Sequence, residues 1–123
     1  MNEVSMSPRG LLEAARGLLT HPTAETVGLW PRAAAVLARQ ALETQVTIVL
    51  TKWIPGIENA NARTKLICLQ ARMQDRELAE RVNHAWWALT TACHHRSYEL
   101  APTAVELEKW IQDVEALVSV GAA

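Results

Sequence analysis

The sequence predicts an all-α protein, a single antiparallel bundle of four to five helices. Apolar residues recur at intervals of three and four along most of the 123-residue chain, which is the spacing of one face of a helix. Hydrophobic residues make up 50% of the composition and aromatic residues only 5%, and this dominance of alanine and leucine suits closely packed helices. We therefore expect one domain over residues 1–123, with its core in residues 8–119.

The first helix is expected to begin at Ser7 and Pro8. Serine caps the free amides at a helix start, and proline suits the first helical position. The helix should end at His21, because the following proline disfavours helical geometry in the residue before it. Its apolar stripe consists of Leu11, Leu12, Ala15, Leu18 and Leu19.

The second helix is expected to start near Pro31 and to stop at Pro55. Residues 46–51 are rich in β-branched side chains, which favour a strand. The chain offers no second strand to pair with them, so we predict a helix here as well. The residues expected to face the core are Leu37, Ala38, Ala41, Leu42, Ile48 and Val49. On the other side of this helix are Arg39, Gln40 and Glu43.

Two further helices are each expected to open with a polar capping residue. Asn59 or Asn61 caps the third helix, which continues to Met73. Asp75 caps the fourth helix, which is expected to run to about Ser97. The inward stripe of the fourth helix consists of Leu78, Val82, Ala85, Trp86, Leu89, Ala92 and Cys93.

The last helix is predicted from a capping box. Thr103 and Glu106 have the required spacing, and they follow a break at Pro102. Short loops between successive helices make sequence neighbours antiparallel. The residues expected to face inward are Leu107, Trp110, Ile111, Val114, Leu117 and Val118.

Charge and cysteine content limit the classes of function. The net charge is −1, from 12 basic and 13 acidic residues, whereas proteins that bind nucleic acid broadly carry an excess of positive charge. Cys68 and Cys93 show no CxxC spacing, so we expect no disulfide framework, and we expect the protein to be located in the reducing cytoplasm. The sequence shows no signal-peptide pattern and no apolar run of membrane-spanning length, which predicts a soluble protein with no membrane partner.

The fourth helix is expected to present a second, more polar face. His84, Trp87, Thr91, His94 and Tyr98 follow one another at intervals of three or four residues. Such a face suits a ligand or a partner protein, with Trp87 as the interface anchor. In the alternative, which we favour, the aromatics cover a half-buried surface and the histidines are solvated near the negative helix end.

Metal-dependent and thiol chemistry are not expected. His94 and His95 are adjacent, so on a helix they point about 100° apart and do not reach one ion together. Cys93 lies on the apolar stripe, where a thiol behaves as core. We therefore predict neither a metal site nor a cofactor.

Two segments resemble HEPN domains (higher eukaryotes and prokaryotes nucleotide-binding). LARQALETQVTIVL, residues 37–50, is similar to their long amphipathic helix. WALTTACHHRSYELAPTAVELEKWI, residues 87–111, is similar to their closing segment, in which a helix ends in histidine and a last helix packs back. The resemblance covers about residues 30–118. The chain is also similar to actinobacterial proteins that share the short segments WPRAAA, ARQALE and ACHH, which implies a bacterial source.

The resemblance also carries an expectation about catalysis. Ribonucleases of this family carry an arginine, then four to six residues, then a histidine on the penultimate helix, and they usually act as dimers. His94 or His95 matches that histidine, but residues 87–91 (WALTT) hold no arginine. Arg39 or Arg63 on another helix would have to replace it in space, a question that the sequence leaves open.

Three hypotheses follow. The one we favour is a non-catalytic HEPN-like module that acts through homodimerisation or a protein partner. The second is a HEPN-type metal-independent endoribonuclease or toxin of a toxin–antitoxin or defence system, the only hypothesis in which RNA is a partner. The third is an unrelated helical adaptor or small-ligand-binding bundle.

Overall fold

Five α-helices and one short 3-10 helix make up the part of the chain that the computed structural model describes, residues 6–21, 28–94 and 100–121. No strand occurs in these ranges, so residues 46–51 are helical, as predicted. The elements are α1 (Pro8–Thr20), α2 (Trp30–Thr51), η1 (Ile57–Asn59), α3 (Ala62–Arg72), α4 (Arg76–Cys93) and α5 (Ala104–Gly121).

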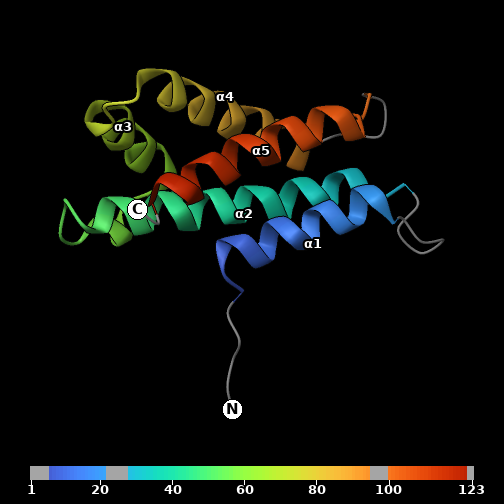
Figure 1. Ribbon diagram of the computed structural model, residues 1–123, viewed down its shortest axis with the longest axis horizontal. Helices are drawn as coiled ribbons and strands as arrows, with labels where there is room; N and C mark the ends of the chain where they lie inside the picture. The colour runs from blue at the N-terminus through green and yellow to red at the C-terminus, as the bar shows by residue number, and fades with distance from the viewer. Residues whose placement is uncertain (1–5, 22–27, 95–99, 122–123) are drawn as a thin grey trace, which may run out of the picture.

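Helix α2 is the centre of the bundle, because it contacts every other helix. Figure 1 shows α1 running antiparallel to α2, while α4 and α5 run antiparallel to each other and α3 crosses at one end. Short side chains on α2 allow its neighbours to approach closely. Its fully buried alanines are Ala34, Ala35, Ala38 and Ala41.

The predicted capping residues are confirmed. Ser7, Asn61 and Asp75 each accept a hydrogen bond from the backbone N–H three residues later, at 3.1, 2.8 and 3.0 Å. Glu106 Oε1 accepts the N–H of Thr103 at 2.9 Å, and Thr103 Oγ1 accepts the N–H of Glu106 at 3.1 Å. Each interaction satisfies an amide that the helix itself leaves unpaired.

Helix α2 differs from the prediction in its end and in one face. It ends at Thr51 rather than at Pro55, because the amides of Lys52 and Trp53 donate to carbonyl groups three residues earlier, which tightens the backbone at this end. Ile48 was predicted to face the core, but it is 42% exposed. Its neighbour Val49, also predicted to face the core, is only 8% exposed; since neighbouring residues point about 100° apart on a helix, burial of Val49 turns Ile48 away from the core.

Helix α4 ends at Cys93, before the predicted end near Ser97. His94 is the C-cap, and its N–H donates to a carbonyl three residues earlier at 3.1 Å, which closes the last turn. Residues 95–99 lie outside the described ranges.

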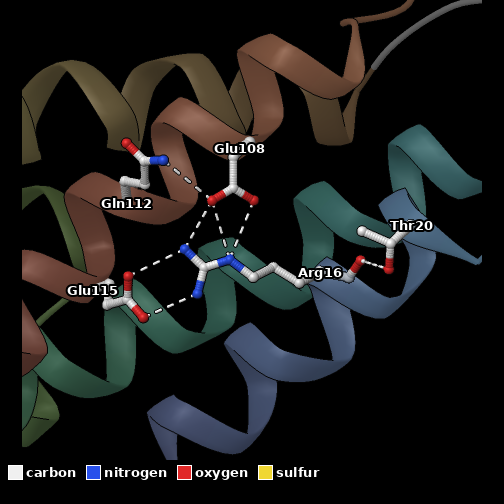
Figure 2. A network of polar contacts seen from close by, with 5 residues as sticks. All are labelled: Arg16, Thr20, Glu108, Gln112 and Glu115. Carbon is white, nitrogen blue, oxygen red and sulfur yellow. Dashed lines mark hydrogen bonds and ion pairs between the residues drawn. The ribbon is translucent and has the colours of Figure 1, made fainter.

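A charge network joins α1 to α5. Figure 2 shows the Arg16 guanidinium between two carboxylates of α5. Its Nη2 lies 2.8 Å from Glu108 Oε2 and its Nη1 lies 2.9 Å from Glu115 Oε2. Gln112 Nε2 also donates to Glu108, at 3.3 Å. The network fixes the position of the first helix relative to the last.

Replacing Arg16 with methionine should reduce stability in a pH-dependent way. Hydrogen bonds from Arg16 hold the pKa of Glu115 below its usual 4.5, so the pair stabilises the fold above that pH and this contribution is lost as the pH falls. Because the groups are about one-third exposed, we expect a loss of about 1 kcal/mol at neutral pH. Urea unfolding at several pH values measures it.

The control is Arg63→Met, which removes an exposed cation of α3 that has no ion pair within the described residues. Its stability should follow the wild-type pH curve. Identical curves for Arg16→Met and the wild type between neutral and acidic pH would contradict the prediction.

Candidate functional site

The first hollow lies between α2 and the end of α4, and it brings two arginines together with a histidine. Its volume is about 480 Å³. Arg32 and Arg39 come from α2, and His94 is the C-cap of α4. The remaining lining residues are Val36, Gln40, Glu43 and Cys93. Side chains from two helices that are far apart in the sequence thus surround one space.

Arg39 is held in place by an aromatic ring. Its guanidinium carbon lies 4.8 Å from the centre of the Trp86 ring, a distance at which a cation is attracted to the ring face. The Nε atom is buried and has no hydrogen-bond partner in the described part of the chain. Arg39 was predicted on the side of α2 away from the apolar stripe, and there it is partly buried and contacts Trp86 of α4.

A second hollow continues along α2 toward α3. Its volume is about 400 Å³, and it shares Gln40 and Glu43 with the first hollow. Lys65 of α3 lines it although that residue is only 7% exposed. Within the described ranges, no carboxylate lies within 4 Å of the Lys65 ammonium group. The other lining residues are Thr44, Thr47 and Ile48.

A third hollow, of about 360 Å³, lies between α4 and the start of α5. Apolar side chains on and around it are exposed to an unusual degree: Leu100 is 99% exposed, Val105 81% and Trp87 54%. Trp110, predicted to be core, is only partly buried and lines this hollow. The other lining residues are Ala88, Thr91, Ala92, Leu100, Ala101, Pro102, Thr103 and Glu106.

The residues predicted on the polar face of α4 are divided between two surfaces. His84, Trp87 and Thr91 are all exposed, and the Thr91 hydroxyl donates to the Trp87 carbonyl oxygen at 2.9 Å. Thr91 lines the third hollow and His94 the first. The predicted residues His95 and Tyr98 lie outside the described residues.

Among the described residues, the arginines differ in whether they lie near His94. Arg39 lines the same hollow, whereas Arg63 does not. Arg81 is engaged elsewhere, since its Nε lies 2.9 Å from Oδ1 of the buried Asp113. Sequence reasoning missed Arg32, although it lies two turns before Arg39 on the same side of α2.

Lys65 was missed as well, for a different reason. It lies four residues before the fully buried Leu69, and this spacing on a helix indicates that it shares the inward side. A lysine at a core-facing position is uncommon unless it is paired, so the spacing was a usable signal.

Two features are absent from the described residues. No helix among them is both long and apolar enough to cross a membrane. Across the same residues, no three histidine, cysteine or acidic side chains gather as metal ligands would. Both cysteines are free. Comparison with protein-family models, with curated proteins and with solved structures finds no match to this chain.

Proposed function

We propose that this chain is a non-catalytic, HEPN-like helical module that forms a homodimer through the surface between the C-terminal part of α4 and the start of α5. The observation that carries the proposal is the exposure of Leu100, which lines a mostly apolar hollow, and of Trp87 and Val105, each of which is next in sequence to a lining residue. Contiguous exposed apolar surface is typical of interaction sites, and buried aromatic residues anchor such interfaces. The two free cysteines suit a reducing cytoplasm as the working compartment.

Replacing Leu100 with glutamate should disrupt self-association. Burial of one exposed leucine contributes about 1.5–3 kcal/mol to the free energy of association. In a symmetric dimer each substitution is present in both protomers, so its effect is doubled. We therefore expect the dimer dissociation constant to rise by about 100-fold or more. Sedimentation equilibrium over a concentration series measures it.

Ile67→Glu is the matched control, because Ile67 is 60% exposed on α3, away from the α4–α5 hollow. It should leave the dimer unchanged. A wild-type protein that remains monomeric at high concentration, or equal weakening by both variants, would exclude this surface as a dimer interface.

A metal-independent endoribonuclease is the second candidate, and one specific observation favours it. Arg32 and Arg39 line the hollow that contains His94, so guanidinium groups are available to hold a phosphate and to stabilise developing charge. The imidazole of His94 is suited to proton transfer. His95 is kept as an alternative acid or base.

Cleavage of single-stranded RNA by the purified protein tests this candidate. If the candidate is right, His94→Ala and Arg39→Gln should each reduce the rate by about 100-fold or more. His84→Ala removes an exposed histidine of the same helix outside the hollow and should leave the rate unchanged. Absence of cleavage by the wild type would leave the non-catalytic module as the proposed function.

A further inference from the structure

The outward side of α2 forms a continuous groove. Val36, Gln40, Thr44 and Ile48 follow one another at intervals of four residues, which places them in one row. The two hollows along this row meet at Gln40 and Glu43. We call this surface the α2 groove; the row is about 18 Å long at the rise of an α-helix. Its lining residues are Arg32, Val36, Arg39, Gln40, Glu43, Thr44, Thr47, Ile48, Lys65, Cys93 and His94.

The α2 groove carries more positive than negative charge. Arg32, Arg39 and Lys65 line it, against the single carboxylate of Glu43. None of the three cations has an ion pair within the described ranges. Lys65 is only 7% exposed as a residue, but its ammonium nitrogen is not among the buried polar atoms that lack a partner, so it reaches solvent at the groove. In a chain of net charge −1, this local excess of positive charge favours an anionic partner.

The positions of the charges and of the apolar side chains limit what that partner is. Arg32 and Arg39 lie toward one end of the groove and Lys65 toward the other, whereas Glu43 lines both hollows where they meet. Exposed apolar side chains flank this arrangement, with Val36 44% exposed and Ile48 42% exposed. The groove therefore suits a ligand with separated anionic groups and apolar side chains.

We propose that the α2 groove binds an acidic, amphipathic segment of a partner protein. Its carboxylates pair with Arg32 and Arg39 at one end and with Lys65 at the other, and its apolar side chains cover Val36 and Ile48. Charge complementarity of this kind sets both the partner and its orientation. The groove shares no lining residue with the α4–α5 hollow, so the proposal does not depend on self-association.

A nucleic-acid strand fits the groove less well. Binding of single strands uses exposed aromatic faces on which bases stack, but Trp86, the aromatic ring nearest Arg39, is only 5% exposed. Glu43 at the middle of the groove repels a regularly spaced run of phosphates. A peptide with acidic residues at chosen positions avoids this repulsion.

A display library of random peptides about 12 residues long, the length of the α2 row at helical rise, tests the proposal. Selection on the wild-type protein should enrich sequences that combine acidic residues with leucine, isoleucine or valine. The most strongly enriched peptide is then labelled with fluorescein, and fluorescence polarisation measures its dissociation constant. A labelled single-stranded oligouridylate serves as the comparison probe.

Lys65→Met and Arg39→Gln should each weaken the selected peptide by about tenfold, as expected for loss of a hydrogen bond to a charged group. Arg32→Gln should also raise the dissociation constant of the selected peptide. Because Arg32 is exposed, this variant tests the proposal even if Lys65→Met does not fold. Arg63→Gln removes the same charge outside the groove and should change affinity by less than about twofold. Leu100→Glu should leave peptide binding intact even where it abolishes the dimer.

Three results would overturn the proposal. The first is enrichment of peptides that lack acidic residues, and the second is that Arg63→Gln weakens peptide binding as much as the groove variants do. The third is that the oligouridylate binds more tightly than the selected peptide and that Lys65→Met abolishes oligouridylate binding. The last result would assign the α2 groove to nucleic acid.

Discussion

Replacing Trp86 with alanine is expected to lower the free energy of unfolding by about 4 kcal/mol. The indole is only 5% exposed, so its removal leaves a large cavity between α2 and α4. The ring also supports the guanidinium of Arg39 at 4.8 Å, and loss of this contact adds to the destabilisation. Urea unfolding followed by circular dichroism measures the effect without relying on tryptophan fluorescence.

Trp87→Ala is a control that differs by one sequence position. Trp87 points about 100° away from Trp86 on the same helix and is 54% exposed, so its replacement should change the free energy of unfolding by less than about 1 kcal/mol. Comparable losses in the two variants would show that Trp86 does not have the core role that its burial indicates.

Enlarging Ala38 to leucine should destabilise the protein by about 3 kcal/mol. Ala38 has no exposed surface and lies on the helix that contacts every other helix. Since well-packed interiors contain few voids, three additional carbons require the neighbouring helices to move apart. Thermal and urea unfolding measure the loss.

Val36→Leu provides the matched enlargement on the same helix. Val36 is 44% exposed, so the added carbon meets solvent and stability should change by less than about 0.5 kcal/mol. An Ala38→Leu protein as stable as the wild type would mean that the helices around α2 are less closely packed than the burial of its alanines indicates.

The elements that sequence reasoning predicted correctly depend on local chemistry. Ser7, Asp75 and Thr103 cap helices because each side chain reaches an amide only three residues away. Such caps require no knowledge of distant residues. The choice of helix at residues 46–51 is different, because it overrode the local β-branched signal and followed from the absence of any strand elsewhere in the chain to pair with.

The errors concern residues whose environment other helices determine. Periodicity placed Arg39 only on the side of α2 away from the apolar stripe, and it did not predict that Trp86 of α4 provides a surface for its guanidinium. Ile48 was assigned to the core because it is apolar, whereas the path of α2 through the bundle places Gln45 there instead. Periodicity gives the spacing of a face but not its direction in a helix that is surrounded on several sides.

For this protein, the sequence by itself determined the all-helical class, the caps and the approximate limits of the helices, because the interactions that specify them span three or four residues. The tertiary structure alone decided that Arg32, Arg39 and His94 surround one hollow and that Lys65 lies almost buried beside it. These residues meet only when α3 and α4 pack on α2, and packing depends on the combined shape of side chains from distant parts of the chain.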